Sequence, residues 1–305
     1  MTSTEPATGP SPSAKAPSAK DRVLAWLRAH AFGLAIANLI ANIGIVVTGG
    51  VVRLTGSGLG CPTWPKCTEE SYVAHEALGI NGVIEFGNRL LTYVLAAIAI
   101  TVVIAVWNRR GVIRNLAIII ALGVPLQGVL GGITVLSQLN PYVVALHLLA
   151  SMAMVGVCVW LLDEIRSPVR EAAPRNVRIA SVVTLVVGWV TLWLGTVVTG
   201  SGPHSGDLES RRTGLDPALM SHIHAYAVYA LIAATLVTLW LGRKNAYVRQ
   251  VTIVLLVIEL AQGLIGWVQY LTDLPVLLVG FHMLGAALVS AGLARVLVST
   301  RAHSA

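Results

Sequence analysis

Residues 127–152 read QGVLGGITVLSQLNPYVVALHLLASM, and residues 262–286 read QGLIGWVQYLTDLPVLLVGFHMLGA. Each stretch is mostly apolar, and in each a histidine follows the first glutamine by 20 residues. Further upstream, VVTGG at 46–50 is matched by VVTGS at 197–201. These matches indicate an internal repeat, in which the two halves of the chain carry the same series of elements.

The composition around these stretches is that of a membrane protein. Of the 305 residues 55% are hydrophobic and only 11% are charged, and the charges lie between long apolar runs. A soluble domain has about 25% charged residues. The net charge of +7 comes from basic clusters beside the runs, and no basic surface is interleaved with aromatics, so no nucleic-acid partner is indicated. The lipid bilayer is the expected surrounding.

Eight apolar runs are long enough to cross a bilayer, which takes about 20 residues. They cover roughly residues 32–53, 83–107, 115–136, 142–163, 179–201, 219–242, 250–272 and 275–297. The predicted fold class is therefore all-α and integral to the membrane, with eight transmembrane helices in two tandem, parallel-repeat four-helix bundles. Four crossings per half give both halves the same orientation, unlike the inverted repeats of many transporters.

The predicted domains follow the repeat. They are a disordered cytoplasmic tail (1–30), an N-terminal half (31–165) with an outer loop (54–82), a cytoplasmic linker (166–178), a C-terminal half (179–298) and a cytoplasmic tail (299–305). Lys and Arg gather in the tails and in the even-numbered connections. The positive-inside rule thus predicts a multi-pass protein of the cell membrane with both termini in the cytoplasm.

A polar face interrupts the second span. Glu85, Asn88 and Arg89 occur at i, i+3 and i+4, so they project from one side of a helix. Charged groups at this depth are costly unless they face protein or a cavity, which makes this face a candidate functional site. A salt bridge between Glu85 and Arg89 is the structural alternative, and such a bridge would also tune the acid. Arg53 and Arg89 could neutralise anionic groups or simply anchor their helices at the interface.

The repeat also pairs histidines. Asn88 precedes Gln127 by 39 residues and His224 precedes Gln262 by 38, so His224 takes in half two the place of Asn88 in half one. His224 and His282 then form a pair on two helices, at a depth of roughly 8–10 Å from the outer end. Such a pair suits the axial ligands of a heme held between helices. Helix-packing histidines are the alternative.

In half one the corresponding pair is His147 and Asn88. His222 is two residues from His224 and points to nearly the opposite face, so we expect it at the membrane interface. A zinc or copper site is a weaker hypothesis, because no cysteine, methionine or third histidine lies at tetrahedral spacing. The heme sites are expected toward the outer face.

The remaining candidate groups leave alternatives open. Cys61 and Cys67 lie in the outer loop with two prolines between them, which predicts a small disulfide loop or a redox pair. Glu85 corresponds to Ser221 in half two, so only one site has an acid that could shuttle protons. Glu259, near the middle of the seventh span, is either part of a proton route or a structural group.

With these residues in place, the chain resembles the heme A synthase family. The matching segments are TGGVVRLTGSGLGCPTWPKC (48–67), IEFGNR (84–89), ALH (145–147) and GFH (280–282), and the resemblance covers about residues 30–300. It implies a membrane heme-dependent oxidoreductase that oxidises the C8 methyl group of heme O to a formyl group. Two successive hydroxylations and loss of water would give heme A for terminal oxidases, a step in cytochrome oxidase assembly.

The resemblance also assigns the site residues. The implied roles are His224 and His282 as axial ligands of a heme b iron, His147, Asn88, Arg89 and Arg53 around the substrate heme, Glu85 as the catalytic acid, and Cys61 with Cys67 as the outer-loop cysteine pair. The family often reads E-x-x-H-R where this chain has Asn88, and an amide is a poor iron ligand. The substrate heme is then expected to have His147 as its only protein ligand.

The resemblance further implies that heme O synthase hands over the substrate. The electron donor, the source of oxygen and any homo-oligomer stay open. The alternative function is a diheme b-type electron-transfer cytochrome without porphyrin chemistry, and a transporter is a third hypothesis. An acid in only one half favours the enzyme, because an electron carrier needs none.

Overall fold

The computed structural model describes residues 18–166, 169–204, 206–207 and 210–303. Eight of its helices are long and apolar enough to cross a membrane. They are α2 (Ala31–Leu54), α3 (Gly79–Val106), α4 (Val112–Leu136), α5 (Pro141–Arg166), α6 (Arg175–Ser201), α7 (Pro217–Gly242), α8 (Ala246–Leu271) and α9 (Val276–Ser299). Each lies within four residues of a predicted span at both ends, so the all-α membrane fold class is confirmed.

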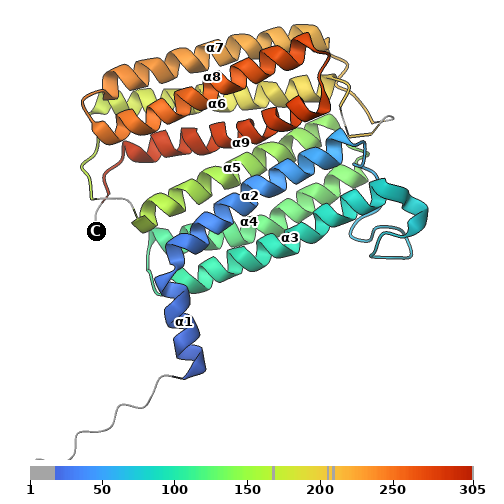
Figure 1. Ribbon diagram of the computed structural model, residues 1–305, viewed down its shortest axis with the longest axis horizontal. Helices are drawn as coiled ribbons and strands as arrows, with labels where there is room; N and C mark the ends of the chain where they lie inside the picture. The colour runs from blue at the N-terminus through green and yellow to red at the C-terminus, as the bar shows by residue number, and fades with distance from the viewer. Residues whose placement is uncertain (1–17, 167–168, 205, 208–209, 304–305) are drawn as a thin grey trace, which may run out of the picture.

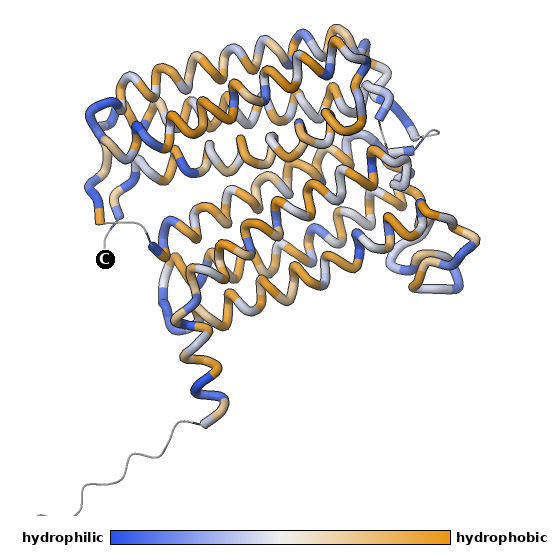
Figure 2. Tube along the Cα trace, viewed as in Figure 1, coloured by the Kyte–Doolittle hydropathy of each residue, from blue (hydrophilic) through white to orange (hydrophobic). Residues whose placement is uncertain are grey.

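The eight long helices run in nearly parallel lines and form two groups of four (Figure 1). Helices α2 to α5 make one group and α6 to α9 the other, with α5 packed against α9 where the groups meet. Helix α2 also contacts α9, and α5 contacts α6. These contacts are consistent with the tandem repeat. Apolar residues run along the helices, and polar residues gather in the connections at both ends (Figure 2).

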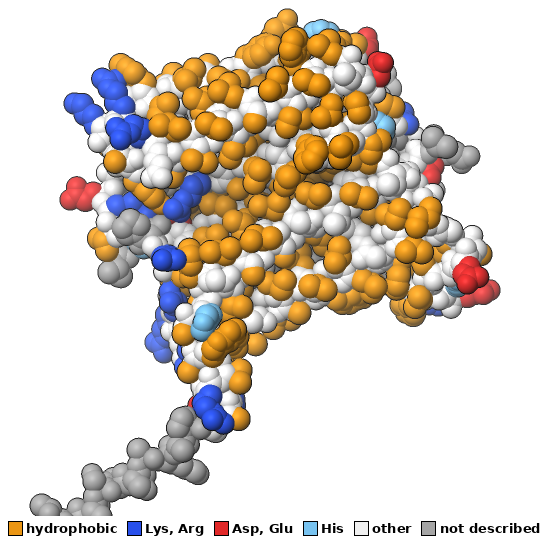
Figure 3. Space-filling view, in the orientation of Figure 1, with side chains coloured by type: hydrophobic (Ala, Val, Ile, Leu, Met, Phe, Trp, Pro, Cys, Tyr) orange, Lys and Arg blue, Asp and Glu red, His pale blue; other side chains and the backbone are white. Residues whose placement is uncertain are grey.

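Each helix group has its own apolar core. A large apolar cluster around Val102, Ile120 and Leu161 fills the first group. A smaller one around Leu255 and Leu293 fills the second. The outer surface of the long helices is also apolar, while Lys and Arg side chains gather at one end of the bundle (Figure 3). An apolar belt with basic residues at one edge is what a bilayer requires.

The start of the chain differs from the prediction. A disordered tail was expected over residues 1–30, but residues 19–29 form the helix α1 (Ala19–Ala29). The Ser18 hydroxyl accepts a bond from the Asp21 backbone N–H, and the Asp21 carboxylate accepts one from the Ser18 N–H. This capping box stabilises the first turn. The Ser18 hydroxyl and the Ser18 N–H both donate to the Asp21 carboxylate, and these two bonds hold the pKa of Asp21 below its usual value. The rest of the predicted tail, residues 1–17, lies outside the described residues.

A buried ionic cluster joins the two groups at the end that carries α1. Asp163 of α5 is 2% exposed, and its carboxylate binds Arg170 at 2.5 Å and Arg295 of α9 at 2.6 Å. The Tyr247 hydroxyl at the start of α8 donates to the same carboxylate. Both guanidinium groups also lie over the Tyr247 ring. One carboxylate thus contacts the linker and two helices of the second group.

Candidate functional site

The polar face of α3 points toward the outer loop. Glu85 is buried, and its Oε2 atom accepts a 2.7 Å hydrogen bond from the backbone N–H of Cys61. Its Oε1 atom forms a 2.6 Å ion pair with Arg89, one turn later on the same helix. The salt bridge along the helix is therefore present, and it coexists with a contact from the loop. This arrangement fixes both carboxylate oxygens.

The loop itself is closed by a disulfide between Cys61 and Cys67. Both cysteines are fully buried. Between them, the Trp64 ring packs against Gly132 of α4, where any larger residue would overlap it. The preceding residue, Gly131, lies beside the His147 imidazole. The disulfide loop is thus in contact with α3 through Glu85 and with α4 through Trp64.

His224 of α7 and His282 of α9 face each other in the second group. Their ring centroids are 6.4 Å apart and their planes are nearly perpendicular, at 81°. The Nδ1 atoms of both rings are buried without a hydrogen bond of normal geometry, although the Thr191 carbonyl lies close enough to interact with His224. The repeat spacing therefore identified two side chains that meet in space.

A glycine lies against each of the three histidines. A Cβ atom on Gly195 or Gly266 would lie 3.3 Å from the Cε1 atom of His224 or His282, respectively. Gly131 and His147 stand in the same relation at 3.5 Å. Gly131 and Gly266 each follow the repeat glutamine by four residues. The repeat therefore contained a sign of these glycine–histidine contacts, which the sequence analysis missed. A side chain at Gly195 or Gly266 would crowd the imidazole, whereas one at Gly131 would make an ordinary contact with it.

Half one departs from this pattern at Asn88. Its side-chain oxygen accepts a 2.8 Å hydrogen bond from the Thr48 hydroxyl of α2. His147 resembles the other two histidines, because its Nδ1 atom is buried without a partner. Sequence reasoning missed the contact with Thr48, since nothing in the repeat pairs these two residues.

The other three candidate residues each have contacts of their own. Arg53 donates from Nη2 to the Thr199 carbonyl of α6, and its buried Nε atom has no partner. Glu259 is 2% exposed, and its Oε1 atom accepts a bond from the Thr235 hydroxyl while Oε2 has no partner. His222 is exposed and bonds the Ala218 carbonyl. His222 is therefore more exposed than His224 and His282, which are half-buried and have buried Nδ1 atoms.

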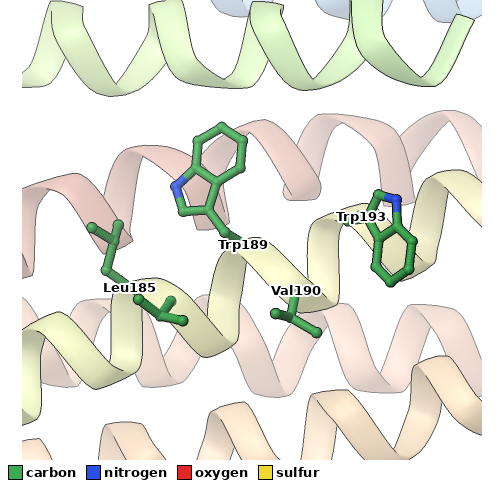
Figure 4. Close-up of a pocket in the computed structure, with 5 residues that line it drawn as sticks. Leu185, Trp189, Val190 and Trp193 are labelled. Carbon is green, nitrogen blue, oxygen red and sulfur yellow. The ribbon is translucent and has the colours of Figure 1, made fainter. Parts of the chain in front are cut away.

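A shallow apolar groove runs along α6, apart from the histidines. Figure 4 shows Trp189 and Trp193 projecting from successive turns of this helix, with Leu185 and Val190 beside them. Its lining carries aliphatic and indole side chains only. A surface of this kind on a membrane-spanning helix suits contact with acyl chains, so we do not assign it to the site.

The histidine pair fits an iron porphyrin better than a bare metal ion. Among the described residues, no group of three or more His, Cys, Asp or Glu could hold a metal ion. A metal–imidazole bond is about 2 Å long, so a metal between two rings places their centroids roughly 6 Å apart. The observed separation of 6.4 Å and the adjoining glycines suit two imidazoles that would hold one iron between them.

Comparison with known proteins gives the family. The family model COX15-CtaA, described as cytochrome oxidase assembly protein, matches residues 33–203. A protein named heme A synthase from Methylobacterium radiotolerans is 28% identical over 54% of either chain. One of that name from Bacillus licheniformis is 30% identical over 38% of either chain. Another, from Rhizorhabdus wittichii, is 26% identical over 91% of this chain and 94% of its own.

In the first alignments, such as that with the Methylobacterium radiotolerans protein, this chain spans about half the length of its relative. The family match extends from the start of α2 to the end of α6, and so includes the disulfide loop, Glu85 and His147. Because the matched segment is more than half of the chain, this protein belongs to the COX15-CtaA family of cytochrome oxidase assembly proteins, the heme A synthase family.

Proposed function

We propose that this protein is a heme A synthase, which oxidises the C8 methyl group of heme O to a formyl group by successive hydroxylations. The observation that carries the proposal is the pairing of His224 and His282 at ligand distance in one half, beside an acid-bearing site in the other. Family membership and the names of the relatives support the same reaction. Heme O is the proposed substrate and heme b the proposed cofactor.

His224 and His282 would hold heme b through its iron. When bound, this group would supply electron transfer to the substrate site. The chain's own contribution is to fix both rings: Gly195 and Gly266 let the helices approach each imidazole closely. Burial excludes water from the Nδ1 atoms, and a nearby Thr191 carbonyl can orient the His224 ring.

Glu85 is the proposed catalytic group of half one. Its two oxygens are held by the Cys61 N–H and by Arg89, so the carboxylate has a defined direction. From there it can accept a proton or stabilise positive charge that develops at the methyl carbon. His147 would hold the iron of the substrate heme, and Asn88 would contribute only an amide at its repeat position.

The two arginines are proposed to lie near the substrate. Arg53 is the better candidate for a propionate partner, because its Nε atom is buried and unpartnered. We also propose that both termini are cytoplasmic and that the heme sites lie toward the outer face, as the distribution of basic residues suggests. Heme O synthase is the proposed source of substrate.

The reaction is tested by expressing the protein in cells that make heme O but no heme A, and then weighing the extracted hemes by mass spectrometry. Heme A and its hydroxylated intermediate should accumulate. A folded, heme-loaded protein that yields neither product would contradict the synthase and would favour the diheme electron-transfer cytochrome.

The site assignment is tested by two substitutions with different signatures. His224→Ala should remove the low-spin heme b spectrum, because one axial ligand is lost. Glu85→Ala should keep that spectrum and lower turnover by at least about 100-fold, the usual contribution of a general acid or base. An active Glu85→Ala enzyme would show that the role of Glu85 is wrongly assigned.

A further inference from the structure

We propose that Arg89 is a positioning residue: it holds the disulfide loop, residues 61–67, closed over the outer end of the first helix group, and so sets the position of Glu85. The loop contacts stand on their own, whereas their importance for catalysis rests on the function proposed above. Arg89 then holds the loop through its carbonyls and orients Glu85 through the ion pair.

All three guanidinium nitrogens of Arg89 are engaged. Nη2 donates to the carbonyls of Cys61 and Thr63, both at 3.0 Å, and Nη1 donates to the Lys66 carbonyl at 3.1 Å. Nε and Nη2 donate to Glu85. The planar fork of a guanidinium suits such multiple acceptors, whereas an ammonium group is a point charge. Arg89 thus contacts both ends and the middle of the loop.

The loop also fits closely against two helices. Gly60 lies so near the backbone of Asn81 and Gly82, at the start of α3, that a side chain at this position would overlap them. On the other side, Trp64 occupies the space over Gly132 of α4. The loop therefore bridges α3 and α4 at the outer end of the half that contains Glu85 and His147.

Movement of the loop would directly change the hydrogen bonding of Glu85. Cys61 provides the N–H that Glu85 Oε2 accepts, and the same residue is tied to Cys67 by the disulfide. Release of Arg89 removes the three carbonyl contacts and the ion pair together. Glu85 would then lose the partner of each of its oxygens, and its orientation with them.

The hold of Arg89 on the loop can be tested without heme, by measuring how fast the disulfide is reduced. Purified protein is treated with a water-soluble phosphine, and the new thiols of Cys61 and Cys67 are counted by mass tagging. Arg89→Gln should speed reduction by at least about tenfold, because several charge-assisted hydrogen bonds are lost. Arg89→Lys should lie between this variant and the wild type. Arg109→Gln, at an exposed arginine beyond the far end of α3, is the matched control and should leave the rate unchanged.

The second readout is the environment of Glu85. Its carboxyl band in the infrared spectrum is assigned by its loss in Glu85→Gln. This band should shift in Arg89→Gln and on reduction of the disulfide in wild-type protein, but not in Arg109→Gln. Equal reduction rates in wild type and Arg89→Gln, or an unmoved band, would overturn the proposal. Faster reduction in a protein that makes no heme A would contradict the synthase function alone.

Discussion

Asn88 is a residue at which the two halves differ in side-chain chemistry. His224, its counterpart, lies against Gly195 of α6, and the repeat VVTG places Gly44 of α2 in the corresponding position. A Cβ atom on Gly44 would meet no other atom within 4 Å. Asn88 instead reaches the Thr48 hydroxyl. The first half thus keeps the glycine that accommodates an imidazole in the second half.

Asn88→His is therefore expected to fit and to add a ligand. If each half holds one porphyrin, the wild type has a bis-histidine site in half two only, and the variant should have two. The low-spin signal per chain, measured by electron paramagnetic resonance on fully loaded protein, should roughly double. Asn88→Gln is the control, because it keeps an amide and should leave the signal at the wild-type level. An unchanged signal in Asn88→His would mean that position 88 does not face the substrate iron.

At the scale of elements, the spans were predictable because each is a long apolar run, a property that is written locally in the sequence. Helix α1 was missed because its composition is mixed and its start depends on a side-chain cap. The Glu85 contact with the Cys61 N–H was missed for another reason. Every residue except proline has a backbone N–H, so no pattern of side chains reveals which one an acid will meet.

Two glycines of α8 allow the proposed heme-binding face of this helix to be tested. Gly266→Ala should push against the His282 ring, where a Cβ would lie 3.3 Å from Cε1, whereas Gly263→Ala meets nothing within 4 Å. Alanine favours a helix over glycine by about 1 kcal/mol, so Gly263→Ala should be neutral or stabilising. Gly266→Ala gains the same helix preference but adds an overpacking cost of about 1–3 kcal/mol, so it should have a lower free energy of unfolding than Gly263→Ala.

Both variants are compared by thermal unfolding in detergent and by heme content after purification. Gly266→Ala should lose heme and show a changed low-spin spectrum, while Gly263→Ala should match the wild type in both. Similar behaviour of the two variants would indicate that the glycine beside His282 does not place the ring.

At the scale of the whole molecule, the two helix groups are joined differently along the seam. Near the end that carries the disulfide loop, the Arg53 guanidinium donates to the Thr199 carbonyl, and a backbone bond joins Gly58 to Gly206. An apolar cluster around Val46, Met152 and Ala287 fills the middle. At the opposite end, the two groups are joined by the ion pairs of Asp163 with Arg170 and Arg295. Because both proposed heme sites lie toward the end with the disulfide loop, the Asp163 cluster can hold the groups together without contacting either site.

Asp163→Asn should therefore destabilise the molecule without altering its chemistry. The substitution leaves Arg170 and Arg295 beside a neutral amide, and breaking a buried ion pair from one side costs about 3–5 kcal/mol. Glu164→Gln is the matched control on the neighbouring residue, whose 3.9 Å contact with His303 is partly exposed and should be worth less than about 1 kcal/mol. Thermal unfolding in detergent should show a much lower midpoint for Asp163→Asn only, while the heme spectrum of the folded fraction stays that of the wild type. If the two midpoints fall by the same small amount, apolar packing along α5 and α9 is sufficient to hold the groups together.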